Sequence, residues 1–442
     1  MLVSIHKQRL ILLLIAVLVI ILPTQAQRWT LQQCIDTAQV KNKQLQISQN
    51  NASIGEQRHK EAVAGLIPKV SINGDYKYYF DLPYQLMPLS TFNLTAPAGQ
   101  FKEAQFGVPH NMNFNVQFSM PLFNSQILGA MKTTNIGNDL NKLQQQKTEE
   151  QVFFDISNLY YNVQILQQQQ VFIDSNLVNT KKLLSNMELL KEQLMVKTTD
   201  VTKVQLQLAQ LRTQKEIVSS KISQILNALK FSMGISINQE IEIDPTIEFR
   251  DLSDFVNQTT VDIRLVETQN RFLKSELSTL KNSRLPSLSL YGTYGQTGFG
   301  YDEKPNDFLK FFPVSFVGVQ LNYPIFNGTV TQRKINQKKL EITNSKLQLS
   351  LATEQNSMLI ENAKRTKITA KLTVENTWSL IKLSQTVYEQ TVLQHMQGTA
   401  NLTDILLADN SFRESQQNYL SAIVEYLKAE LELKKLTGNL SK

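Results

Sequence analysis

Four segments of the chain alternate apolar and polar residues with a period of two, which predicts β-strands with one apolar face. They lie near 69–80, 113–122, 287–296 and 315–325. In the first, Val70, Ile72 and Tyr76 alternate with Ser71 and Asp75. Each run is about ten residues long, the length of a tilted transmembrane strand. A soluble sheet with one solvated face would alternate in the same way, so the alternation alone leaves both interpretations open.

The intervening segments predict very long helices, because proline is absent over stretches of up to 71 residues. These stretches are 125–195, 201–233, 327–397 and 402–437. At about 1.5 Å per residue, a seventy-residue helix would reach about 100 Å. We expect antiparallel helical hairpins whose tips lie near 196–200 and 398–403.

Both shorter helices carry an apolar seam with the 3-4 spacing of a coiled coil. The first seam comprises Val201, Val204, Leu208, Leu211, Val218, Ile222, Ile225 and Leu229, interrupted by Lys215. The second comprises Ile405, Ala408, Phe412, Ser415, Tyr419, Ala422, Tyr426, Ala429, Leu433 and Leu436. The seam predicts that Tyr419 is buried and that Leu420, one residue away, faces water.

The chain repeats itself, and the two seams coincide after a shift of 204 residues. Gln117–Asn124 returns as Gln320–Asn327, and Pro68–Ile72 returns as Pro286–Leu290. Thr199, Asp200 and Val201 return as Thr403, Asp404 and Ile405, and Gly234 returns as Gly438. These matches predict two tandem repeats, 27–234 and 235–442. Each reads helix, strand, strand, long helix, long helix.

Prolines mark the expected joints between helices and strands, because proline holds the residue before it in an extended conformation. Pro68 and Pro286 stand where a helix gives way to a strand. Pro121 and Pro324 stand near the return from strand to helix. The connection at 81–112 is long for a hairpin, and we expect a loop that faces outward and folds over the mouth of any barrel that the strands form.

The N-terminus has the pattern of a secretory signal peptide over residues 1–26. His6, Lys7 and Arg9 precede an apolar run from Leu10 to Leu22, and Ala26 precedes a plausible cleavage site. The chain is therefore expected to be exported. An uncleaved anchor is the alternative interpretation.

Composition disfavours several classes of function. The formal charge of +7 is mild and no basic cluster is interleaved with aromatics, so nucleic-acid binding has little support. The four histidines are scattered, and phosphate-loop, metal-ligand and nucleophile motifs are missing from the sequence, so we expect neither an enzyme nor a cofactor. Cys34 is the only cysteine and is expected to be a small packed residue.

Four strands cannot close a barrel alone, and lipid tolerates no open sheet edge because unpaired backbone groups are costly there. Several chains must therefore share one barrel if these strands span a membrane. Two chains would give eight strands and three would give twelve. A trimeric adhesin, with a barrel anchor and a coiled-coil stalk, is the competing hypothesis. Such an anchor is expected once at one chain end, whereas here two strand pairs are internal.

These features resemble the TolC-like outer-membrane efflux and secretion ducts. The resemblance is carried by Trp29–Ile35, the paired strand-exit motifs and Gly398–Leu406. It implies a membrane β-barrel continued by a long α-helical coiled-coil barrel, with twelve strands and twelve helices in a homotrimer. It also implies a passive exit duct in the outer membrane with a long periplasmic extension. Its tip would be opened by a periplasmic adaptor protein coupled to an inner-membrane pump.

The same resemblance implies a periplasmic gate. Asp404 matches the constricting acidic position of the family, whereas Leu407 stands where a second acidic residue would be. Thr199 and Asp200 match first-tip residues of the closing contacts, and His395 replaces a tyrosine that faces the first-tip aspartate. In addition, Ala400 replaces an arginine and Leu194 replaces a glycine. The alternative is that Thr-Asp merely caps each helix, since this pair is also common at an N-cap.

Overall fold

The structure is a computed structural model, which describes residues 28–91, 95, 97, 99–247, 258–301 and 310–440. The predicted signal peptide lies outside these residues. The chain forms two compact units. The first takes its described residues from Met1–Ala52, Lys142–Val266 and Gln348–Lys442, and the second from Ser53–Asn141 and Glu267–Leu347. Each unit therefore draws on both predicted repeats.

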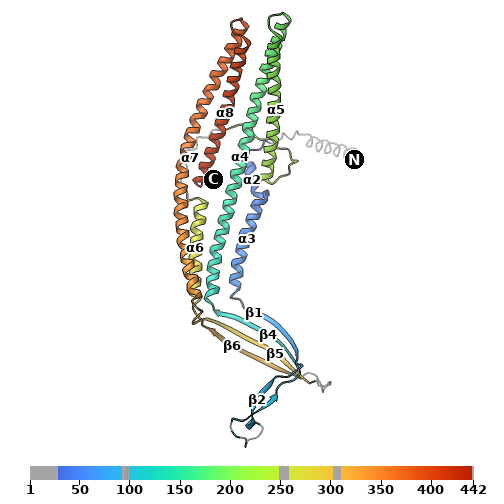
Figure 1. The fold of residues 1–442 in the computed structure, drawn as a ribbon, viewed down its shortest axis with the longest axis vertical. Helices are drawn as coiled ribbons and strands as arrows, with labels where there is room; N and C mark the ends of the chain where they lie inside the picture. Colours follow the sequence, from blue (N-terminus) through green and yellow to red (C-terminus); the bar gives the residue numbers. More distant parts are fainter. Residues whose placement is uncertain are drawn as a thin grey trace, which may run out of the picture. The chain divides into compact units, whose positions relative to one another are not determined.

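The second unit contains a four-stranded antiparallel sheet in the order β1-β4-β5-β6 (Figure 1). Its strands are β1 (Lys69–Tyr78), β4 (His110–Phe123), β5 (Ser287–Gly300) and β6 (Lys310–Asn322). All four predicted strands are present. Their ends differ from the prediction, because β4 and β5 continue beyond the regular alternation and β6 begins and ends earlier.

The register places the apolar residues of neighbouring strands opposite one another. Val70 pairs with Phe118, and Ile72 pairs with Val116. Met120 pairs with Leu290, which pairs with Val319 on the far side. Because alternate residues point to opposite faces, these pairs make one continuous apolar face, as the alternation predicted. Its members on the outer strands are exposed, for example Ile72 at 66% and Val319 at 59%. On the central strands its members are partly buried, for example Phe118 and Leu290.

The connection at 81–112 was predicted as a loop, but it contains a small hairpin. Strands β2 (Tyr84–Pro88) and β3 (Phe101–Gln105) pair antiparallel, and a 3-10 turn, η1 (Leu89–Thr91), follows β2. Pro88 ends one strand, and each strand has only five residues. Such short strands carry too little alternation to be recognised in the sequence.

The four joint prolines lie close to their expected places. Pro68 and Pro286 directly precede β1 and β5. Pro324 lies two residues beyond β6. Pro121 differs, because it lies inside β4, where the register with β5 shifts between Pro121 and Phe123. A proline cannot donate to the sheet, and such an irregularity accommodates it.

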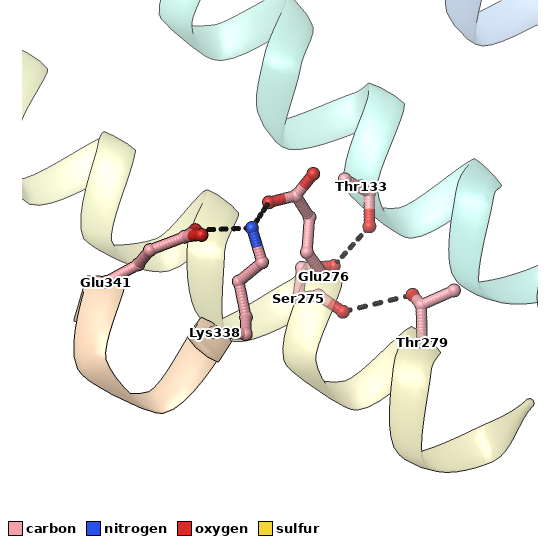
Figure 2. Close-up of polar contacts among 6 residues, drawn as sticks. All are labelled: Thr133, Ser275, Glu276, Thr279, Lys338 and Glu341. Carbon is pink, nitrogen blue, oxygen red and sulfur yellow. Dashed lines mark hydrogen bonds and ion pairs between the residues drawn. The ribbon is translucent and has the colours of Figure 1, made fainter. Parts of the chain in front are cut away.

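Within the second unit, α6 (Val261–Asn282) packs closely against α4 (Ser125–Glu192). A Cβ on Gly129 would overlap the Thr279 side chain, so this approach requires glycine. Figure 2 shows the neighbouring polar contacts, in which the hydroxyls of Thr133 and Ser275 lie 2.8 Å apart. Lys338 of α7 (Val330–Met396) contacts Glu276 at 3.0 Å and Glu341 at 2.5 Å. Burial disfavours the charged amine, but these two carboxylates prevail and raise the pKa of Lys338.

The first unit is built from two antiparallel helical hairpins, α4–α5 and α7–α8, with α5 at Thr198–Met233 and α8 at Leu402–Leu436 (Figure 1). The predicted seam of α5 is buried at Val201, Val204, Leu208, Leu211, Val218 and Leu229. The exceptional Lys215 forms an ion pair with Asp174 of α4 at 2.7 Å. A seam lysine is therefore accommodated by a carboxylate on the facing helix.

The prediction for Leu420 is wrong. Its exposed fraction is 2%, and it packs with Ile423, Leu427, Ile165 of α4 and Ala370 of α7. Tyr419 is only partly buried and lies against Trp378, with ring centroids 5.2 Å apart. One seam predicts one buried face, but α8 contacts both its own hairpin partner and the other hairpin. It is therefore buried on two faces.

Near the end of α5, α2 (Leu31–Lys41) and α3 (Lys43–Ala64) pack into the core of the first unit. Cys34 is fully buried beside Ile156, Leu229 and Met233, which confirms it as a packed residue. Burial raises the pKa of its thiol to about 12. Gly234 ends α5 with φ 72°, and a Cβ there would overlap the Lys41 carbonyl. Among the described residues, none of the helices combines the length and the apolar character that a membrane span needs.

Candidate functional site at the helix tips

The first tip turns through a left-handed residue that is not glycine. Leu194 has φ 63°, and its N–H donates to the Lys191 carbonyl at 2.9 Å. The next N–H, of Met195, donates to the Leu190 carbonyl at 2.8 Å. This pair of bonds is the Schellman ending of a helix, which normally uses glycine because a Cβ is strained there.

The second tip has the same geometry with the expected residue. Gly398 has φ 77° and donates to the His395 carbonyl at 2.9 Å, while Thr399 donates to the Gln394 carbonyl at 2.9 Å. Each of these positions lies 204 residues after its counterpart in the first tip. The two tips therefore share one backbone design, and Leu194 is the departure from it.

Asp404 caps α8. The N-cap residue is Asn401, whose side chain accepts from the Asp404 N–H at 3.0 Å. In return, the Asp404 carboxylate accepts from the Asn401 N–H at 2.8 Å, which completes a capping box. The capping role suggested by the sequence is confirmed for Asp404, although Thr403 is not the N-cap residue.

The first tip lacks this arrangement. Lys197 occupies the N-cap position of α5 and makes no side-chain cap, so the expectation of a cap at Thr199 is wrong. Asp200 lies in the first helical turn and contacts the Lys203 amine at 3.3 Å. A carboxylate in the first turn is favourable because the helix N-terminus carries partial positive charge.

His395 lies in the last turn of α7 and is partly buried. Its Nδ1 lies 2.8 Å from the Ala400 carbonyl oxygen. A carbonyl only accepts, so Nδ1 carries the proton in this bond. Among the described residues of one copy, neither a hydrogen bond nor an ion pair joins His395 to Asp200. Within one copy, His395 therefore bonds to the turn that follows its own helix.

Apolar contacts bring the two tips together. Leu402, at the start of α8, is buried with Met187 of α4 and with Val201 and Val204 of α5. A groove of about 1180 Å³ lies beside this cluster and is lined by residues of α4, α7 and α8. Apolar side chains such as Phe172, Met187, Trp378 and Ile381 predominate in its lining, which also includes His395.

Behind the tips lies a buried polar cluster that the sequence did not reveal. Asp409 has an exposed fraction of 4%, contacts Arg413 Nη2 at 2.8 Å and accepts from Gln207 Nε2 of α5. Two turns further, Asn176 of α4 donates to Gln416 of α8 at 2.9 Å. Burial raises the pKa of Asp409, while Arg413 and the bond from Gln207 act in the opposite direction.

Similar folds occur among solved outer-membrane channels. The outer membrane protein VceC of Vibrio cholerae is 13% identical, with a TM-score of 0.73, and the match covers 92% of this chain and 96% of that one. The CmeC outer membrane channel of Campylobacter jejuni is 14% identical, with a TM-score of 0.72, and the match covers 92% of this chain and 85% of that one. The MtrE outer membrane channel of Neisseria gonorrhoeae, solved in its open state, is 14% identical, with a TM-score of 0.70. That match covers 93% of this chain and 89% of the MtrE chain. No protein-family model and no curated protein matches the sequence.

The described chain therefore has the fold of the outer-membrane factor channels, the TolC-like class. The match extends over the sheet and both helical hairpins, since it covers nine-tenths of the chain. At identities of 13–14%, the likeness is one of fold.

Proposed function

We propose that this chain is one of three identical subunits of an outer-membrane channel that serves as a passive exit duct for efflux or type I secretion. The observation that carries the proposal is the sheet of the second unit. Its outer strands, β1 and β6, each pair on one side only among the described residues. Its apolar face is continuous, and it is exposed on the outer strands at residues such as Ile72 and Val319. Lipid contact would cover that face, and pairing of β1 with β6 of the next copy would close the edges.

Three copies of four strands would give a twelve-stranded barrel in the outer membrane, and their hairpins would give a twelve-helix periplasmic extension. The chain would then consist of a removed signal peptide at 1–26 and two tandem repeats at 27–234 and 235–442. The shared 204-residue offset of the two tip turns supports the repeats. In this role the channel works with a periplasmic adaptor and an inner-membrane pump, and it has no enzymatic activity of its own.

The tips would form the resting closure, with Thr199, Asp200, His395 and Asp404 at contacts between copies. His395 is partly buried at the second tip, and Asp200 projects from the first turn of α5. A ring of three Asp404 carboxylates would attract cations beside the constriction. The joint prolines, Pro68, Pro121, Pro286 and Pro324, would fix the passage between helix and strand.

The adhesin hypothesis expects its membrane anchor at one chain end. Here the sheet takes β1 and β4 from one predicted repeat and β5 and β6 from the other, which favours the duct.

Conductance across planar lipid bilayers tests the channel. Purified protein should give discrete current steps, and Leu402→Asp should enlarge them because it breaks the apolar cluster that joins the tips. A matched control is Leu206→Asp, since Leu206 of α5 is 60% exposed. Absence of current from both the parent and the Leu402→Asp protein, each inserted in the bilayer, would contradict the proposal.

A further inference from the structure

The joint between the two hairpins changes character along α8. At the tip, Leu402 packs on apolar residues of the first hairpin. Further along, the contacts become polar, with Asp409 against Gln207 and Gln416 against Asn176. Beyond these, Leu420 and its neighbours pack on Ile165 and restore an apolar contact. A polar layer thus lies between two apolar ones. Among the described residues, Asp409 is the only carboxylate of this layer that bonds to the other hairpin.

Asp409 has few partners for a buried charge. Arg413, one turn along the same helix, is the charged neighbour, and its side chain is 20% exposed. From α5 comes the neutral Gln207 amide, and from α4 the neutral Asn176 reaches Gln416. From α7 comes Tyr388, whose ring stacks on Phe412. Burial first, and then the charge of Asp409, raises the pKa of Tyr388 to about 12, so this phenol stays neutral.

Two buried polar atoms of this cluster lack a hydrogen-bond partner, namely Gln207 Oε1 and Arg413 Nε. The first is a free acceptor next to the carboxylate. A carboxylate can only accept, whereas a neutral carboxylic acid also carries one O–H donor. Rotation of the Gln207 amide by half a turn would present Oε1 to that donor. The cluster can therefore hold Asp409 in its neutral form with a hydrogen bond between the hairpins.

We propose that Asp409 makes the joint between the hairpins proton-dependent, so that the closed joint takes up a proton at Asp409 and separation of the hairpins releases it to water. In the closed joint the neutral acid donates its O–H to Gln207 Oε1. In the separated joint the carboxylate is solvated and ionised, and Arg413 remains beside it on the same helix. The device acts within one copy of the chain and does not depend on the channel role.

The direction of the pH effect follows from the two environments. Burial raises the pKa of Asp409 in the closed joint, whereas exposure to water returns it to the ordinary carboxyl range. The closed joint therefore binds the proton more tightly. By linkage, closure gains as pH falls through the raised pKa, and separation gains as pH rises above it.

Distances between spin labels on the two hairpins test this inference in the full-length, detergent-purified protein. Labels would be placed at Gln205→Cys of α5 and Leu407→Cys of α8, both exposed positions, in a Cys34→Ala background. Proteins that carry only one of the two labels show which distances arise between different copies of the chain. We expect the population of the short distance to increase as pH falls from 8 to 5, and Glu414→Gln, at an exposed acid of the same helix, to leave that response unchanged.

Two variants make the test specific. Asp409→Asn mimics the neutral form and should hold the short distance at every pH. Arg413→Gln removes the charge that opposes burial, and it should move the midpoint of closure upward by about 1–3 pH units. An unchanged midpoint in Arg413→Gln, or the same pH response in the parent and Asp409→Asn, would overturn the inference. A monomeric mass would contradict the proposed channel and leave these distances measurable.

Discussion

Leu194 and Gly398 adopt the same left-handed backbone, with φ 63° and 77°, at equivalent turns of the two tips. Leu194 is 93% exposed, so no packing compensates the strain of its Cβ. A non-glycine residue in this conformation costs about 1–2 kcal/mol. The first tip therefore holds strain that the second tip avoids.

Leu194→Gly should relieve this strain and raise the free energy of unfolding by about 1 kcal/mol. Hydrogen exchange of the tip amides, together with thermal denaturation followed by circular dichroism, measures the change. Gly398→Ala is the matched reverse substitution and should destabilise its tip, since space is open around that Cβ and only the backbone is strained. A loss of stability in Leu194→Gly would show that the leucine is favourable there.

Lys197→Asn should install the missing capping box on α5. The introduced asparagine side chain would accept from the Asp200 N–H, as Asn401 does from Asp404, and should stabilise the helix start by about 0.5–2 kcal/mol. Slower hydrogen exchange over the first turn of α5 would record the gain. The double variant Lys197→Asn/Asp200→Ala lacks the carboxylate that would accept from the N–H of residue 197. The part of the gain that comes from this second bond should therefore disappear.

The two buried faces of α8 predict an order of damage among three adjacent aspartate substitutions. Leu420→Asp should be the most harmful, since the lost packing alone is worth about 2–5 kcal/mol. Tyr419→Asp should be milder because Tyr419 is only partly buried. Asn418→Asp, at an exposed position of nearly equal shape, is the control. Melting temperatures of the purified proteins rank them, and equal values for Leu420→Asp and Asn418→Asp would contradict the burial of Leu420.

The proposed contact between His395 and Asp200 of a second copy should help to hold the channel closed at rest. His395→Ala should therefore raise single-channel conductance. His395→Gln retains a donor for the Ala400 carbonyl and separates the local bond from the loss of the imidazole ring. Identical conductance curves for the parent and His395→Ala, from pH 5 to 8, would exclude the role of His395 in closure.

Much of the fold follows from the sequence because two periodicities are strong. Alternation identified the apolar face from Val70 to Val319, and the heptads identified the seam from Val201 to Leu229. Leu420 and Asp409 were missed for one physical reason. They lie off the seam of their own hairpin, and contacts with the other hairpin contribute to their burial.

The tips show a similar limit. The repeated Thr-Asp pair located both helix starts, but the N-cap residues are Lys197 and Asn401, two positions before each threonine. Capping depends on where the backbone leaves helical geometry, and a local sequence motif leaves that point uncertain by a few residues. The bond from His395 to Ala400 depends in turn on the path of the tip turn.

The central claim is that three copies share one barrel, and the mass of the intact detergent-purified complex tests it most directly. With 50.4 kDa for the full chain, the proposed signal peptide included, native mass spectrometry should give a mass close to three mature chains once detergent is removed. A stable complex of one or two chains, with β1 and β6 protected from exchange, would contradict the account.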